Sequence, residues 1–212
     1  MALDVVYADD AIVVLNKPSG LLSVPGRGED KQDCLSRRVQ AQFPDALIVH
    51  RLDMATSGLM VMARGATLQR QLNDAFALRK VHKAYEAVVA GLLPPTPQPG
   101  QLIALPIAVD WPNRPLRVID PVLGKPSETI MHRLKSDLVT NTSRVTLEPV
   151  TGRSHQLRVH LQAIGHPIVG DALYAPPAVA AQAQRLLLHA RFLSFIHPKT
   201  GTSVAFNCPG DF

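Results

Sequence analysis

Short strand-forming runs dominate this sequence and limit the folds open to it. Most of these runs are rich in β-branched or aromatic residues and are bounded by Pro, Gly, Asn or Asp, which end strands and favour turns. Strands are expected at residues 4–7, 11–15, 46–50, 59–63, 81–89, 116–119, 127–134, 144–149, 186–195 and 202–206. Apolar residues at helical spacing predict helices at 32–43, 67–79, 155–164 and 179–185. Because strands outnumber helices and do not alternate regularly with them, we expect an α+β fold built on a mixed, mainly antiparallel β-sheet with flanking helices.

One proline-rich segment interrupts this pattern. Leu92 to Gly100 contains four prolines, which cannot donate backbone hydrogen bonds and so exclude a helix or a central strand there. We interpret the segment as a connector between two halves of one sheet. The whole chain of 212 residues lies within the usual size range of a domain, roughly 50 to 250 residues, so a single domain over 1–212 is expected.

Composition excludes several classes of protein. A hydrophobic fraction of 46% and a charged fraction of 18% exclude a disordered chain. There is no apolar run of about 18 residues and no basic start followed by an apolar block, so neither a membrane partner nor a secretory leader is expected, and the predicted location is cytoplasmic. Cys34 and Cys208 stand alone without a Cys-x-x-Cys partner, which predicts plain half-buried thiols. The net charge of +5 permits a polyanionic partner without requiring one.

A first cluster of reactive side chains lies between two expected strands, at His50-Arg51-Leu52-Asp53-Met54-Ala55-Thr56-Ser57-Gly58. A loop anchored on strand ends can hold a reactive carboxylate rigidly, and Thr, Ser and Gly suit a tight turn. The alternative is that Asp53 only caps the turn by accepting backbone N–H groups. On this segment alone, the capped turn is the better explanation.

A second cluster follows Gly152. At helical spacing Arg153, Gln156 and His160 fall on one face of the expected helix, while Leu157 and Leu161 fall on another. Such a polar, basic face could look into a cleft and bind phosphates or hold an ionised carboxylate. An ordinary solvated helix surface explains the pattern equally well.

Other chemistries receive little support. His50, Asp53, His155 and His160 could be imagined as metal ligands, but His155 and His160 are five residues apart, unlike the i, i+4 pair of a helical zinc site. Ser57 lacks the Gly-x-Ser-x-Gly turn of hydrolases, and Gly124-Lys125-Pro126-Ser127 lacks the upstream glycine of a phosphate loop.

Two aromatic residues need consideration as well. Tyr85 lies on an amphipathic strand, where a tyrosine is usually part of the core. The turn-prone loop Asp110-Trp111-Pro112-Asn113-Arg114-Pro115 combines an aromatic ring with an arginine, which can stack on bases or clamp an RNA backbone.

Taken together, these segments resemble the RluA family of RNA pseudouridine synthases. The resemblance extends from about Asn16 to Phe206 and rests on four motifs in matching order: residues 50–58, Lys83-Ala84-Tyr85, residues 152–160 and Gly165-His166-Pro167-Ile168-Val169-Gly170-Asp171. It implies a catalytic fold with a central RNA-binding cleft. Only 49 residues precede His50, so we expect the short architecture without the S4 RNA-binding domain that many relatives carry.

The family's activity implies one task for these residues. Asp53 would be the nucleophile or proton-abstracting carboxylate that lets uracil detach from C1′ and rejoin through C5, and Arg153 would be its cationic partner. Tyr85 would be the ring that packs on the uracil and takes the C5 proton. Arg51 would fill the space left by the extruded base. The resemblance also implies substrate contacts by His50, Lys17, Lys83, Arg114, Arg158 and Leu187.

The family also implies the partners. The expected substrates are 23S rRNA, at position 746, and the anticodon stem-loop of tRNAs, at position 32. No cofactor, no metal and no obligate protein partner are expected, and the predicted state is a monomer. The alternatives are the same reaction on only one of these RNAs or on another rRNA or tRNA uridine, and a non-catalytic RNA-binding module.

Overall fold

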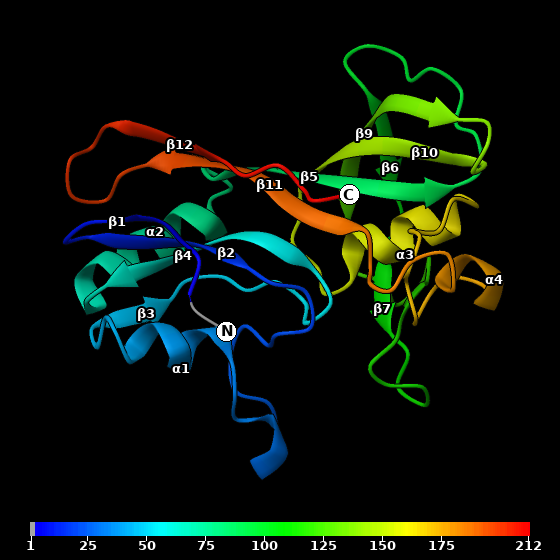
Figure 1. The fold of residues 1–212 in the computed structure, drawn as a ribbon. Coiled ribbons are helices and arrows are strands. Elements are labelled where there is room, and N and C mark those ends of the chain that lie inside the picture. Colours follow the sequence, from blue (N-terminus) through cyan, green and yellow to red (C-terminus); the bar gives the residue numbers. More distant parts are fainter. Residues whose placement is uncertain (1–2) are drawn as a thin grey trace. The chain divides into compact units, whose positions relative to one another are not determined.

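The computed structural model describes residues 3–212, which form two compact units. The first unit contains the chain up to Lys83 together with His189–Asp211, and the second contains Ala84–Leu188 with Phe212 (Figure 1). The single domain expected over 1–212 stays a prediction.

The first unit is a sheet with helices packed against it. Its elements are β1 (Val5–Ala8), β2 (Ile12–Lys17), the 3-10 turn η1 (Glu29–Lys31), α1 (Leu35–Gln40), β3 (Ala46–Ile48), β4 (Ser57–Arg64), α2 (Ala66–Ala77), β11 (Leu188–Ile196) and β12 (Ser203–Asn207). The strand order is β1-β2-β4-β11-β12, and β3 also pairs with β4. Among the pairings of these strands within residues 3–212, only β4–β11 is parallel, so this sheet is mixed and mainly antiparallel.

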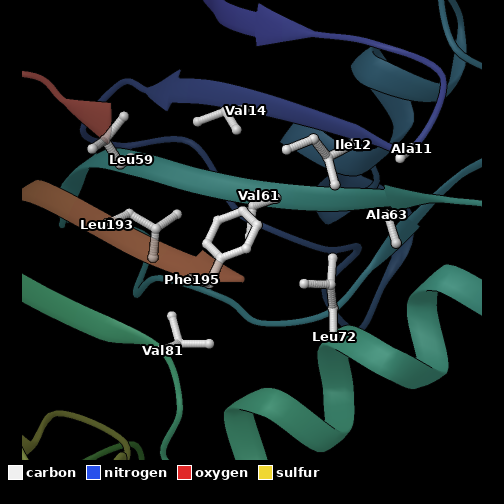
Figure 2. Packing of buried hydrophobic residues seen from close by; sticks show 10 residues of the cluster. All are labelled: Ala11, Ile12, Val14, Leu59, Val61, Ala63, Leu72, Val81, Leu193 and Phe195. Carbon is white, nitrogen blue, oxygen red and sulfur yellow. The ribbon is translucent and has the colours of Figure 1, made fainter. Parts of the chain in front are cut away.

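The central strands of this sheet, β2 and β4, are buried on both faces. Ile12 and Val14 of β2 belong to one core cluster with Leu72 of α2, while the alternate residues Val13 and Leu15 belong to a second cluster that contains α1 residues. Figure 2 shows the first cluster, in which side chains of β2, β4, α2 and β11 gather. Burial on both faces explains why β2 and β4 have uninterrupted apolar runs instead of the alternation of a half-exposed strand.

The second unit is built mostly from antiparallel strands. It contains β5 (His82–Ala90, whose first two residues belong to the first unit), β6 (Gln101–Ala104), β7 (Ile107–Val109), β8 (Arg117–Ile119), β9 (Glu128–Asp137), β10 (Thr142–Pro149), α3 (Gln156–Ala163) and α4 (Pro177–Ala180). The strands β5, β10, β9 and β6 form an antiparallel series in that order, and β7 pairs with β8 in a separate two-stranded sheet.

The expected fold class is confirmed, and several local predictions are wrong. The interpretation of Leu92–Gly100 as a connector between two halves of one sheet is wrong, because it joins β5 to β6 within the second unit. The helix expected at 179–185 is instead the single turn α4, and the helix expected at 32–43 is limited to α1. The strands β6 and β7 were not predicted. Among residues 3–212, no helix is long and apolar enough to cross a membrane.

Candidate active site

Asp53 lies in a turn that leads directly into β4. The backbone N–H of Thr56 donates to the carbonyl of Asp53 at 3.1 Å, which closes the turn, and Asp53 itself is half-buried. Gly58 in β4 has φ +111, and a Cβ added there would lie 2.4 Å from the carbonyl oxygen of Ala190. The parallel pairing of β4 with β11 therefore requires glycine at this position, and it fixes the backbone just beyond the turn.

The segment Lys17–Ser23 supports the Asp53 turn through hydrogen bonds to its backbone. Ser23 Oγ donates to the carbonyl of Leu52 at 2.7 Å and accepts the Leu52 N–H at 3.1 Å. Ser19 Oγ donates to the carbonyl of Ala55 at 2.7 Å, and the Gly20 N–H donates to that of Met54 at 2.8 Å. Residues on both sides of Asp53 are thus fixed by a segment about 30 positions earlier in the chain.

Lys17 completes this support from a fully buried position. Its Nζ donates to the carbonyls of Pro18 at 2.9 Å, Leu21 at 2.7 Å and Met54 at 3.1 Å. Burial lowers the pKa of Lys17 to about 8, and the negative charge of Asp53 partly opposes that change. A buried ammonium with three carbonyl acceptors acts on the loop geometry, so this structure does not support the predicted phosphate contact of Lys17.

His50 and Lys83 both lie against Phe76 of α2. The His50 ring stacks on the Phe76 ring with centroids 4.6 Å apart, and Lys83 Nζ lies 5.8 Å from the same centroid. His50 Nε2 accepts the backbone N–H of Val61 at 3.0 Å, which places its proton on Nδ1. Burial, followed by the charge of Lys83, lowers the pKa of His50 to about 3, and burial also lowers the pKa of Lys83.

Arg51 differs from its neighbours because its side chain is exposed. No hydrogen bond or ion pair was found for its guanidinium within residues 3–212. Its flat cation is thus available to RNA, as the predicted role requires.

Ser57 contacts a histidine but cannot serve as a surface nucleophile. Ser57 Oγ lies 2.9 Å from His189 Nδ1, and His189 Nε2 lies 2.9 Å from the carbonyl of Cys208. Both side chains are buried in the core of the first unit, Ser57 with 6% and His189 with 4% of its surface exposed. The pair therefore ties β4 and β11 together in the interior.

In the second unit, Tyr85 and Arg153 occupy different environments. Tyr85 is half-buried on β5, opposite Leu147 of β10. Arg153 is exposed in the turn that precedes α3, where its backbone N–H donates to Gln156 Oε1 at 3.0 Å. An exposed guanidinium on a turn with a fixed backbone can pair with an anion, which is compatible with the role that the resemblance implies.

The prediction of a polar face on α3 is wrong, both as the lining of a cleft and as a solvated surface. Gln156 is 4% exposed and donates to the Glu128 carbonyl at 2.9 Å, and His160 is fully buried between Thr129 and the Leu105 carbonyl, each at 3.0 Å. Burial lowers the pKa of His160, which favours the neutral ring. These side chains join α3 to β9 and the segment before β7 and neither look into a cleft nor face solvent.

His155 also departs from its prediction. It precedes α3 with φ 59 instead of lying inside the helix, and its Nδ1 lies 2.6 Å from Tyr174 Oη. Among residues 3–212, no group of three or more His, Cys, Asp or Glu side chains is arranged to hold a metal ion.

Arg158 forms a buried ion pair. Its Nε donates to Asp171 Oδ2 at 2.8 Å and its Nη2 to Asp171 Oδ1 at 2.6 Å, with 4% and 0% of the two side chains exposed. The guanidinium also lies 5.0 Å from the Tyr174 ring centroid. This bidentate pair gives Arg158 a structural partner and leaves its predicted phosphate contact without support.

The remaining two predicted contacts lie elsewhere in the second unit. Arg114 is exposed on the loop between β7 and β8, with its guanidinium carbon 3.5 Å from the ring centroid of Trp111. Leu187 is half-buried, and its backbone bonds to Val88 and Val169. Sequence reasoning missed the supporting residues Ser19, Ser23 and Phe76, since nothing in the local sequence marks which distant segment they contact.

Comparison with known proteins identifies the family. The family model described as RNA pseudouridylate synthase matches residues 11–163. The chain belongs to this family. It is therefore an RNA pseudouridine synthase, an isomerase that acts on RNA.

Named relatives and a solved structure agree with this assignment. The dual-specificity RNA pseudouridine synthase RluA of Escherichia coli (strain K12) is 50% identical over 99% of this chain and 94% of the relative. That of Yersinia pestis is 48% identical over 98% of this chain and 99% of the relative. The structure of human RNA pseudouridylate synthase domain containing 1 is 30% identical, has a TM-score of 0.81 and covers 99% of this chain and 84% of that one.

Within this pseudouridine synthase, the family match includes both the Asp53 turn and its support. Lys17, Asp53, Tyr85 and Arg153 all lie inside residues 11–163, whereas Leu187 lies outside. The supported Asp53 turn is accordingly the candidate catalytic centre of the first unit.

Proposed function

We propose that this enzyme isomerises specific uridines in 23S rRNA and in the anticodon stem-loop of tRNAs, with Asp53 as the catalytic carboxylate. By resemblance, the targets are position 746 of the rRNA and position 32 of the tRNAs. The substrate range is supported by the relatives that are about half identical over nearly the whole chain and are named as dual-specificity enzymes.

The reaction exchanges one glycosidic bond for another. The bond between C1′ and N1 breaks, a bond between C1′ and C5 forms, and the proton at C5 is lost while N1 gains one. The target base must first leave its stack, which costs a few kcal/mol. Arg51, which is exposed, would occupy the vacated space.

The remaining roles are those that the resemblance implies. Asp53 acts at the sugar or the base as the catalytic carboxylate, and Arg153 is its cationic partner. Tyr85 packs on the uracil and accepts the C5 proton. The reaction exchanges no electron or phosphoryl group, so these side chains suffice for it.

The observation that carries the proposal is the support of the Asp53 turn. Four backbone or side-chain donors from the Lys17–Ser23 segment bond to the carbonyls of Leu52, Met54 and Ala55 on either side of the aspartate. A mere surface cap does not need such an array, whereas a catalytic carboxylate must be held within a fraction of an ångström of its working position.

Tritium release tests the proposal. The protein is incubated with tRNA and with 23S rRNA fragments that carry tritium at uracil C5, beside an Asp53→Ala variant. The expected result is release from both RNAs by the wild-type enzyme and none by the variant. Release from one RNA alone would restrict the substrate range, and undiminished release by the variant would remove Asp53 from its role.

The same assay separates the competing explanations. A non-catalytic RNA-binding module would bind both RNAs without releasing tritium, and a metal-dependent reaction would stop in a chelator. We also propose that the enzyme is a monomer, which light scattering at assay concentrations tests.

A further inference from the structure

The loop between β7 and β8 presents a large aromatic ring to solvent. Trp111 is 67% exposed, and the guanidinium carbon of Arg114 lies 3.5 Å from its ring centroid. No other ring or cation was found against Trp111 within residues 3–212. The cation on one face of this exposed indole leaves the opposite face of the ring for another planar group.

The loop is held in one conformation by its own contacts. Asp110 accepts the backbone N–H of Asn113 at 3.3 Å and the Asn113 side-chain amide at 3.0 Å. The Leu116 N–H donates to the carbonyl of Asn113 at 3.0 Å, and the Asp110 N–H donates to that of Leu116 at 3.1 Å. A ring on such a loop loses little conformational freedom when something stacks on it.

The base of the loop is fixed as well. Arg117 Nη1 donates to the carbonyls of Pro115 at 2.9 Å and Leu116 at 3.0 Å, and the Arg117 N–H donates to Tyr174 Oη at 2.9 Å. Tyr174 belongs to the small core that contains Ile107 of β7 and Val159 of α3. The Trp111 loop is thus anchored to the interior of the second unit.

We propose that Trp111 is a stacking platform for an unpaired nucleobase of the RNA substrate, with Arg114 supporting the ring from the other side. Folded RNA is recognised mainly at loops and bulges, where unstacked bases lie on aromatic side chains. Arg117 at the base of the loop supplies positive charge, which suits a polyanion, while the loop's own carboxylate, Asp110, is bonded to Asn113. The proposal rests on the proposed function, because it takes the occupant of this surface to be the substrate RNA.

This assignment changes the expected role of Arg114. A guanidinium stacked on an indole orients and polarises the ring. A guanidinium that instead contacted a phosphate would neutralise it and release counterions from the RNA. Arg114→Gln should therefore weaken RNA binding with little change in the salt dependence, while loss of a phosphate contact would reduce the slope of log affinity against log salt by about one.

The chain offers a direct reporter, because Trp111 is its only tryptophan. Titration with an RNA that the wild-type enzyme modifies should quench the tryptophan fluorescence. A series of RNAs with single abasic nucleotides should contain one position whose substitution restores the fluorescence although the RNA still binds. Saturating RNA that leaves the fluorescence unchanged would overturn the proposal.

Variants give an independent test. Trp111→Ala should raise the RNA concentration for half-maximal tritium release about ten-fold, as expected for losing one base–aromatic stack, and change the plateau rate less than two-fold. Trp111→Phe should recover part of the loss. Val122→Ala, which shortens another exposed apolar side chain of the second unit, should behave as wild type.

The outcomes are distinguishable from failure of the proposed function. If the wild-type enzyme releases no tritium from any RNA, the proposed function fails. If it releases tritium but Trp111→Ala has the wild-type concentration dependence, the function stands and the stacking platform is wrong.

Discussion

The Asp53 turn and the Trp111 loop are both fixed, but by opposite means. The Asp53 turn is held by buried donors from a distant segment, including a lysine with no exposed surface. The Trp111 loop is held mainly by hydrogen bonds among its own residues, most of them exposed, and only its base bonds to Tyr174. We therefore expect the Asp53 turn to be sensitive to substitutions throughout the first unit and to govern the rate of the chemical step. The Trp111 loop should respond only to local substitutions and should govern the affinity for RNA.

Replacement of Lys17 should have the largest effect. Lys17→Met removes the donor to three carbonyls, so we expect the free energy of unfolding to fall by about 2–4 kcal/mol and the rate of tritium release at saturating RNA to fall about 100-fold through displacement of the Asp53 turn. Urea unfolding and single-turnover assays measure the two quantities.

A matched control is Lys199→Met, which removes an exposed lysine that pairs with Asp10. It should change the unfolding free energy by less than about 1 kcal/mol and leave the rate unchanged. A Lys17→Met enzyme with the wild-type rate would break the assignment of Lys17 to the support of the turn.

The next effect concerns pH and His50. Because its pKa in the folded protein is about 3, the unfolded chain binds a proton between about pH 3 and pH 6.5 that the folded protein does not. The free energy of unfolding should therefore fall as the pH is lowered through this window, at about 1.4 kcal/mol per pH unit from this group.

His50→Gln keeps an acceptor for the Val61 N–H and cannot titrate, so its unfolding free energy should depend less steeply on pH between 4 and 6. Equal slopes for the variant and the wild type, measured by urea unfolding, would show that His50 is protonated in the folded enzyme.

The smallest effect is expected in the Trp111 loop. Asn113→Ala removes the side-chain hydrogen bonds to Asp110, which are exposed, so the free energy of unfolding should fall by no more than about 1 kcal/mol. The affinity for RNA should fall two- to three-fold as the loop loses its order. A loss of plateau rate at unchanged affinity would contradict the division of roles between the two regions.

The sequence predicted the classes of element and the position of the Asp53 turn between two strands better than the partners of individual side chains. The strands β2 and β4 could be expected from their apolar, β-branched runs, whereas β7 is three residues long and follows a proline, so its pattern carries little information. The Asp53 turn could be located between two strands, but Ser23 and Lys17, which hold it, lie 30 and 36 positions before Asp53 and have ordinary local sequences.

The arginines show the same limit. Arg153 was expected on the polar face of the helix and Arg158 among the substrate contacts, yet Arg153 precedes α3 and is exposed, while Arg158 is buried against Asp171. Helical spacing gives the direction of a side chain and not what packs against it, and the partner of Arg158 arrives on a loop 13 residues later. Burial of Gln156 and His160 has the same cause, since β9 supplies the groups that they contact.

The most direct test is pseudouridine formation by Asp53→Asn, which keeps the size of the side chain and removes its charge. Nucleosides from a single-turnover reaction on tRNA and 23S rRNA fragments are separated by chromatography, and RNA binding is followed by the fluorescence of Trp111. We predict that RNA quenches the fluorescence of the Asp53→Asn variant with the wild-type affinity and that the variant forms no pseudouridine. Pseudouridine formation at a rate near that of the wild type would contradict the assignment of Asp53 as the catalytic carboxylate.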